Sequence, residues 1–393
     1  MSRRAVALVL ALAVSLVAAA CSTAGSDPEP PAAAATVATA PATTAARTPA
    51  KPRKPVDRTP SSARRLRHVT TITGDLAPKS VVASQTGLFF AQNMMYRHTI
   101  SVYDRRFRLR RTISDAVDLG RFGVRGHAGT VRGAPVEAAF LPDGSAAYVS
   151  NYSMYGAGFG PEGHDVCSPS SGYDDSFVYR VDTRRLRIDG AIRVGAVPKY
   201  VAVTPDGKRV LVSNWCSYDL SVINVARGRQ SRRIPLGAYP RGIAVGPGGK
   251  YAYVAVMGST DIARVRLSDL SVGWLRGVGN APRHLVIDAA GDYLYATLNG
   301  EGRTAKIDLR TGRVVAKVAT GDAPRSMDIA PDGRSLYIVN YESNTVSKVR
   351  TRDMAVLQTV ATNADPIGIT YDMATRQVWV ACYTGSLMVF RDV

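Results

Sequence analysis

The stretch VPKYVAVTPDGKRVLVSN, residues 197–214, decides the fold of this chain. A proline opens a run of alternating residues, Pro205-Asp206-Gly207 interrupts it, and a second run rich in valine follows. Alternation with a period of two is typical of a half-buried β-strand. Pro-Asp-Gly favours a tight turn, because proline fixes φ and glycine accepts a positive φ. The stretch therefore predicts two antiparallel strands joined by a turn.

The same pattern recurs along the chain with an equivalent proline in each copy: Pro78, Pro135, Pro198, Pro240, Pro282, Pro324 and Pro366. The last five prolines are 42 residues apart, whereas the first two intervals, of 57 and 63 residues, each hold an insertion. A third strand is expected in each unit, for example at 220–224 and 345–349. A unit of about 40 residues built from several short strands is typical of a propeller blade.

We therefore predict an all-β fold, a seven-bladed β-propeller of four-stranded antiparallel blades, over residues 66–393. The seventh unit ends at Val393 and has room for only three strands. Residues 67–72 resemble the closing strand of other units and precede the first blade. We expect this segment to complete the seventh blade, because ring closure leaves no open sheet edge.

These residues resemble the YVTN-repeat β-propeller family, whose pattern runs P-x-x-[IV]-A-[VI]-x-P-D-G-x-x-[LV]-Y-V-[ST]-N. The third and sixth units match best, whereas Val256 and Cys382 replace the asparagine in units four and seven. The resemblance covers about residues 66–393. It implies the fold strongly and the function weakly, because the family spans enzyme-linked, surface and binding proteins.

The N-terminus indicates export. Two arginines precede an apolar run over residues 5–20, which has the length of a signal-peptide core and is short for a membrane span. Small residues lead into Cys21 and resemble a bacterial lipobox, with Ala18 where leucine is usual. We predict a lipoprotein signal peptide over 1–20 and lipidation of Cys21, which would anchor the protein extracytoplasmically to the cell membrane. Ordinary secretion after cleavage near Ala20 is the alternative.

Residues 21–65 contain the lipidated cysteine and then a basic linker rich in proline, alanine and threonine. With almost no large apolar residue, such a segment buries too little surface to offset its ordering entropy. We expect a semi-extended tether between the membrane and the propeller.

The chain carries a formal net charge of +19, and most of this excess falls within the predicted propeller. A basic exported domain favours anionic partners, such as lipid headgroups, wall polymers, nucleic acid or an acidic protein. Solubility and lineage composition are an equally good explanation. Nucleic-acid binding would give a steep salt dependence, but no strand motif combines aromatic with basic residues.

The residue after the repeat proline is basic in five units: Lys79, Lys199, Arg241, Arg283 and Arg325. In propellers of this type, this position begins the innermost strand at one mouth of the channel, so the five cations would converge and attract an anion. Val136 and Ile367 interrupt the ring, and Glu137 would partly neutralise it. The alternative is a repeat residue that only bonds carbonyl groups of the next blade.

The insertion over about residues 153–175 in unit two is a second candidate, because long loops in compact units often serve as lids. Its aspartates lack EF-hand spacing and its one histidine has no partner, so we expect no metal. Cys167 in this loop and Cys216 in the neighbouring blade are predicted to form a disulfide, with two free thiols as the alternative. Cys382 is expected to be a buried apolar side chain.

The sequence contains no Gly-x-Ser-x-Gly, Cys-x-x-Cys-His or Walker motif, so we predict no catalytic residue and no cofactor. His127, Glu137 and His284 could still face the channel. The leading prediction is a monomeric module that binds an anionic ligand or a protein partner at the channel mouth. The alternatives are a lactonase-like hydrolase or lyase on the same face, and a nucleic-acid-binding protein.

Overall fold

The computed structural model describes residues 58–126, 129–153 and 166–393, and residues Asp57–Val393 form one compact unit. The predicted signal peptide, Cys21, most of the linker, His127 and the centre of the blade-two loop lie outside the described residues. Among those described, no helix is long and apolar enough to cross a membrane.

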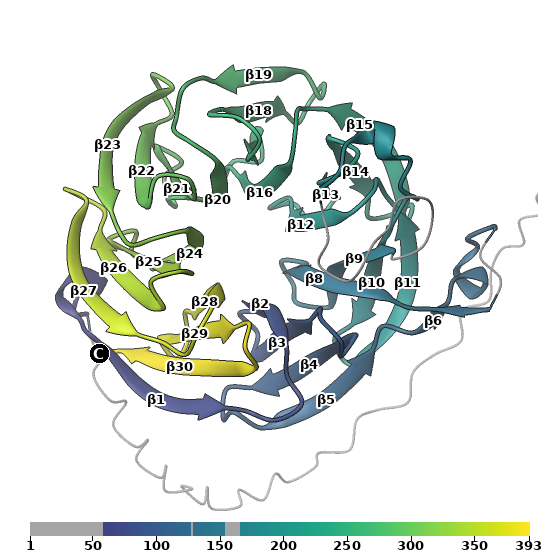
Figure 1. Cartoon of the computed structure of the whole chain (residues 1–393), viewed down its shortest axis with the longest axis horizontal. Helices are drawn as coiled ribbons and strands as arrows, with labels where there is room; N and C mark the ends of the chain where they lie inside the picture. The colour runs from purple at the N-terminus through teal and green to yellow at the C-terminus, as the bar shows by residue number, and fades with distance from the viewer. Residues whose placement is uncertain (1–57, 127–128, 154–165) are drawn as a thin grey trace, which may run out of the picture. The chain divides into compact units, whose positions relative to one another are not determined.

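Seven four-stranded antiparallel sheets surround a central channel, which confirms the predicted propeller (Figure 1). In six blades the chain runs from the innermost to the outermost strand. Blade one contains β2 (Pro78–Ala83), β3 (Leu88–Asn93), β4 (Thr99–Asp104) and β5 (Leu109–Ser114). Blade two contains β8 (Gly133–Phe140), β9 (Ala146–Ser153), β10 (Phe177–Asp182) and β11 (Arg187–Arg193). Blade three contains β12 (Pro198–Val203), β13 (Arg209–Asn214), β14 (Asp219–Asn224) and β15 (Arg229–Pro235).

The remaining blades repeat this plan. Blade four contains β16 (Pro240–Val245), β17 (Tyr251–Val256), β18 (Ile262–Arg266) and β19 (Val272–Leu275). Blade five contains β20 (Pro282–Ile287), β21 (Tyr293–Leu298), β22 (Arg303–Asp308) and β23 (Arg313–Ala319). Blade six contains β24 (Pro324–Ile329), β25 (Ser335–Asn340), β26 (Thr345–Arg350) and β27 (Ala355–Ala361). Blade seven contains β28 (Pro366–Asp372), β29 (Gln377–Cys382), β30 (Ser386–Asp392) and the N-terminal β1 (Leu66–Ile72).

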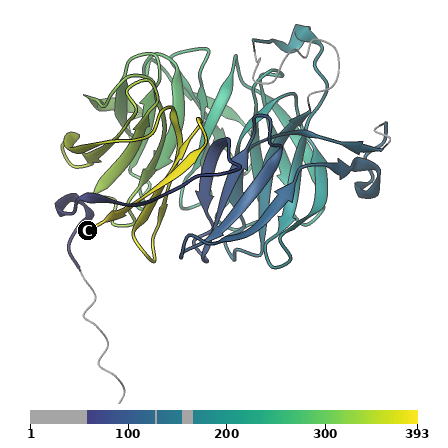
Figure 2. The ribbon, with the colours of Figure 1, turned by 60° about the horizontal axis from the view of Figure 1, so that its bottom comes forward.

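Short elements fill the insertions. The first insertion holds β6 (Val117–Asp118), the 3₁₀ turn η2 (Leu119–Phe122) and β7 (Thr130–Val131), and it projects from the rim of the ring (Figure 2). Two other 3₁₀ turns are η1 (Ser61–Ala63) and η3 (Pro169–Ser171). They lie before β1 and in the blade-two loop.

Strand β1 closes the ring by pairing antiparallel with β30, as predicted. Side chains reinforce the closure, because Lys348 of blade six donates a hydrogen bond to Asp392 and both side chains are fully buried. The Tyr337 hydroxyl donates to the other Asp392 oxygen at 2.8 Å. The folded unit also extends before residue 66, since Ser61 is buried and bonds Asp332 through its amide and its hydroxyl.

The core consists of the layers between adjacent blades, because each sheet turns one face to each neighbour. Aromatic pairs mark these layers: Phe89 of blade one stacks on Trp379 of blade seven at 4.1 Å, and Phe90 meets Phe140 of blade two edge-on. Offset and edge-on pairs of this kind add to area burial. The innermost strands thereby stand side by side and present one face to the channel.

The predicted turns between the first two strands have the expected backbone. Their glycines have φ between 63° and 78°: Gly144, Gly207, Gly249, Gly291 and Gly333. A residue with a Cβ is strained in this left-handed region, so glycine fits the turn.

Candidate functional site

Each innermost strand opens with a bulge that places consecutive residues in the channel. Its register with the next strand shifts just after the repeat proline, for example between Pro78 and Ser80 and between Pro324 and Ser326. A bulge leaves one residue unpaired and redirects side chains. As a result, the residue after each proline lies at the channel mouth, and the next one lies deeper.

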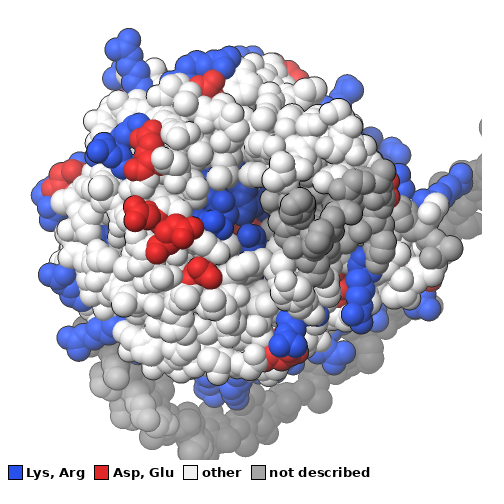
Figure 3. Space-filling model, viewed as in Figure 1, with Lys and Arg blue, Asp and Glu red and all other residues white. Residues whose placement is uncertain are grey.

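The structure brings all five predicted cations together around one pocket of about 330 Å³ at this mouth. Figure 3 shows a group of Lys and Arg side chains, in blue, in the central hollow of this face. The pocket is lined by Lys79, Met94, Lys199, Trp215, Arg241, Met257, Arg283, Arg325 and Tyr383. Val136 and Ile367, the two non-basic residues at this repeat position, are buried and do not line the pocket.

The cations lie close enough to act on one another. Burial, and then the charges of Arg241 and Arg283 above all, lower the pKa of Lys79 well below its ordinary value. Burial also lowers the pKa of Arg325, whose Nε has no hydrogen-bond partner among the described residues. Arg241 donates to the carbonyl of Lys199 in the adjacent blade at 2.9 Å, as the structural alternative expects. The mouth is thus a site of concentrated positive charge.

Aromatic side chains interleave with the cations, which the sequence analysis missed. Arg325 lies 3.5 Å from the ring centre of Tyr341, and Lys79 lies 5.1 Å from that of Tyr383. Lys199 lies near the rings of Tyr152 and Trp215. Most of these rings belong to the residue that directly follows the second strand. This shared position in the repeat could have identified them from the sequence.

The residues before the repeat prolines turn the chain into the channel. Five of them have φ between 50° and 62°, an uncommon conformation outside glycine: Val197, Tyr239, Ala281, Ala323 and Asp365. Backbone hydrogen bonds hold this turn, as between the Trp215 amide and the Val197 carbonyl at 2.9 Å. The cations are therefore carried on a fixed backbone.

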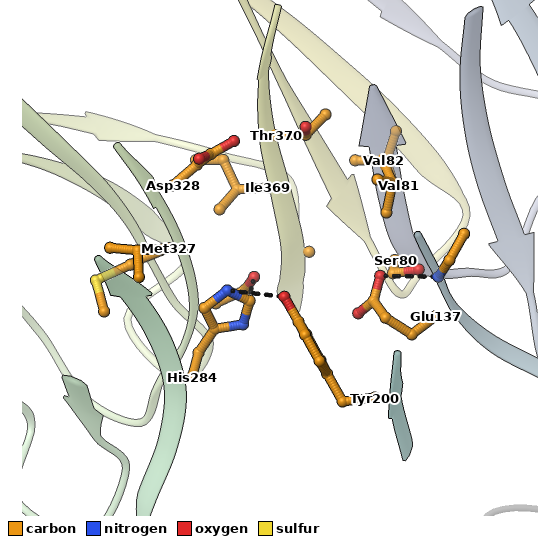
Figure 4. A pocket seen from close by; sticks show the side chains of 14 residues that line it. Ser80, Val81, Val82, Glu137, Tyr200, His284, Met327, Asp328, Ile369 and Thr370 are labelled. Carbon is orange, nitrogen blue, oxygen red and sulfur yellow. Dashed lines mark hydrogen bonds between the residues drawn. The ribbon is translucent and has the colours of Figure 1, made fainter. Parts of the chain in front are cut away.

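A second cavity, of about 130 Å³, lies in the channel one layer below the cations. Figure 4 shows Tyr200 between His284 and Glu137, with Asp328 and Thr370 on the neighbouring strands. The Tyr200 hydroxyl lies 3.4 Å from His284 Nε2. Of the three predicted channel-facing residues, the structure thus brings Glu137 and His284 to one cavity, while His127 is outside the described residues.

The ionisable groups of the cavity have shifted pKa values. Burial raises the pKa of Glu137 to about 7, against the opposing effect of Arg241. Burial likewise raises the pKa of Asp328 to about 6, although the amides of Ile329 and Tyr371 donate to its carboxylate. Burial, followed by the charge of Arg241, lowers the pKa of His284 to about 3. At neutral pH the imidazole is therefore uncharged.

The predicted disulfide between Cys167 and Cys216 is present, with Cα atoms 5.3 Å apart. Both cysteines pack with Met94 and Trp215, which line the cationic pocket, and the Tyr218 hydroxyl donates to the Cys167 carbonyl at 2.9 Å. The bond therefore fixes the end of the blade-two loop beside the mouth.

Two other predictions concern metals and Cys382. In the part of the chain that the structure describes, no cluster of three His, Cys, Asp or Glu side chains could hold a metal ion. Cys382 is fully buried and forms no disulfide, and burial raises the pKa of its thiol to about 11, which makes it a poor nucleophile.

No protein-family model matches the sequence, and no curated protein matches it. Function is therefore inferred from the chemistry of the channel.

Proposed function

We propose that this chain is an exported, membrane-anchored propeller, similar to YVTN-repeat proteins, that binds an anionic ligand or an acidic protein partner at the channel mouth. One observation carries the proposal: five cations from five blades converge on a single pocket of about 330 Å³.

Such a ring is unfavourable by itself, because like charges in a partly buried site repel one another. Burial lowers the pKa of Lys79 most, and the charges of the other four cations lower it further, which is the effect of this repulsion. An anion would relieve it, and each guanidinium can hold a carboxylate or phosphate with two parallel hydrogen bonds. Low-dielectric channel walls would strengthen the attraction. The arrangement therefore favours anion binding over a purely structural role.

Membrane anchoring is part of the proposal and rests on Cys21 and the residues before it. The Cys167–Cys216 disulfide supports an exported protein, because such bonds persist in oxidising compartments. In a bacterial host, we expect the wild-type chain in the membrane fraction and a Cys21→Ser variant in the soluble exported fraction. A Cys21→Ser variant that stays with the membrane would contradict the lipid anchor.

The binding test is calorimetric titration of the full-length protein, in detergent, with phosphate, sulfate, citrate and acidic peptides. It compares wild type with an Arg241→Gln, Arg283→Gln, Arg325→Gln triple variant. The matched control removes three arginines whose side chains are more than four-fifths exposed on the outer surface: Arg121, Arg310 and Arg352.

We expect an anion to bind wild type and the surface control and to lose affinity at least tenfold in the mouth variant, since each charged hydrogen bond contributes about 1.5–3 kcal/mol. Equal loss in both variants would mean that net charge alone attracts anions. Binding of oligonucleotides with a steep salt dependence, and no binding of small anions, would favour the nucleic-acid alternative.

A hydrolase or lyase remains a second candidate, because Glu137 and His284 line one cavity. A carboxyl group with a pKa near 7 suits general acid–base chemistry at neutral pH. Hydrolysis of small anionic esters or lactones by wild type, abolished in a Glu137→Gln variant, would establish this function. Activity unchanged in that variant would remove Glu137 from any such mechanism.

A further inference from the structure

The cavity below the cations is lined by groups that suit uncharged hydroxyls. Tyr200 and Ser326 contribute hydroxyl groups that can both donate and accept, whereas the hydroxyls of Ser80 and Thr370 already bond Gln92 and the Ala83 amide. Neutral His284 also offers one donor and one acceptor nitrogen, and its contacts to Tyr200 and Ser326 are long, at 3.4 and 3.3 Å. Long contacts are weak, so these groups can turn to a ligand at little cost.

Charge excludes the other polar ligands from this cavity. The five cations directly above it repel an ammonium group. Glu137 and Asp328, when ionised, repel a second anion from within. A ligand that enters the channel is therefore anionic at the mouth and neutral but hydrogen-bonding at the deeper end.

The two chambers have sizes that match such a ligand. The cavity, of about 130 Å³, has room for about four water molecules, which is the size of a glycerol-like group. The mouth pocket is larger and can hold a phosphate with its hydration. Consecutive residues connect the two, as with Arg283 and His284 on β20 and Arg325 and Ser326 on β24. One short molecule can therefore contact both layers.

We propose that the mouth and the cavity form one composite site for a polyol phosphate, with the phosphate against the cations and a short hydroxylated chain inside the channel. This inference rests on the proposed anion binding and names the ligand class. The phosphate is favoured over a single carboxylate because it can satisfy several cations at once.

The test is titration of the full-length protein, in glycerol-free buffer, with inorganic phosphate, glycerol 3-phosphate, glycerol and phosphoethanolamine. A Tyr200→Phe, Ser326→Ala variant removes two cavity hydroxyls without touching the cations. Tyr253→Phe in the core of blade four, with a buried side chain, is the matched control.

We expect glycerol 3-phosphate to bind about tenfold more tightly than phosphate, because one or two net hydrogen bonds are added. The cavity variant should reduce this advantage at least threefold and leave phosphate affinity unchanged, while the control keeps the advantage. Equal affinity for the two ligands, or tighter binding of phosphoethanolamine, would overturn the inference while leaving anion binding intact. If phosphate and glycerol 3-phosphate both fail to bind, the proposed function fails as well.

A further experiment distinguishes two sources of the ligand, a membrane headgroup and a free polyol phosphate. Vesicles of phosphatidylglycerol present a glycerol beyond the phosphate, whereas phosphatidylcholine vesicles do not. Competition of phosphatidylglycerol vesicles with soluble glycerol 3-phosphate would identify a membrane headgroup, and binding of the soluble compound alone would identify a free polyol phosphate. Either result supports the composite site.

Discussion

Reduction of the Cys167–Cys216 disulfide should destabilise the propeller by an amount that follows from the chain between the two cysteines. The bond closes a loop with a sequence separation of 49 residues. In the chain-entropy model, cross-linking a loop of this length removes about 14 cal/mol/K from the unfolded state, or about 4 kcal/mol at 25 °C. The partners sit in packed surroundings, with Cys216 1% exposed, so reduction should leave the native contacts in place.

The assay is equilibrium urea unfolding of wild type with and without reductant. We expect the free energy of unfolding to fall by about 4 kcal/mol on reduction, chiefly through the unfolded state. A Cys167→Ala, Cys216→Ala variant should resemble the reduced protein and should not respond to reductant. A fall of less than about 1 kcal/mol would refute the entropic account, and a response of the double variant would show that reductant acts elsewhere.

Three further predictions concern the ring and its channel. Lys348→Met should lower the free energy of unfolding by about 3–5 kcal/mol, because it removes the cation that pairs with the buried Asp392 carboxylate. Lys306→Met loses a carbonyl contact and a cation–π contact with Tyr293 but leaves no buried carboxylate without its cation, so it should cost clearly less; equal costs in urea unfolding would contradict this. Glu137→Gln should gain stability relative to wild type as the pH rises from 5 to 8. The raised pKa makes the folded wild type hold a proton that the unfolded chain has released, so wild type loses stability over this range and the variant does not. A difference in melting temperature between the two proteins that stays constant from pH 5 to 8 would refute this. Gly242→Ala should cost about 1–3 kcal/mol, since its Cβ would lie 2.6 Å from a backbone oxygen of blade five, whereas Gly248→Ala, with open space around it, should be nearly neutral in thermal melts.

The sequence by itself determined the architecture. Prolines at fixed spacing, alternating residues and Pro-Asp-Gly turns specify each blade, because strand faces and tight turns depend on local chemistry. The missing fourth strand of blade seven was predictable for the same reason, since a ring with three strands in its last blade leaves an open edge. The Cys167–Cys216 pair followed from the neighbouring positions of two loops in that ring.

Repetition also made the cationic mouth predictable. A residue in the same place of each repeat occupies the same place in each blade. In a closed ring of blades, Lys79 and Arg283 must therefore lie around the same mouth of the channel. Three of the aromatic partners, Trp215, Tyr341 and Tyr383, likewise share one repeat position, directly after the second strand, so the repeat also encodes their place at the mouth.

Only the tertiary structure decided the chemistry of the cavity. Glu137, Tyr200 and His284 share one repeat position, the second residue after the proline, so the repeat predicts that they lie together; their residue types differ from blade to blade, and Asp328 comes from another position. Their pKa values depend on how deeply the channel buries them and on the charges that other blades hold nearby. Because burial and distance between blades are properties of the closed ring, no single repeat encodes them.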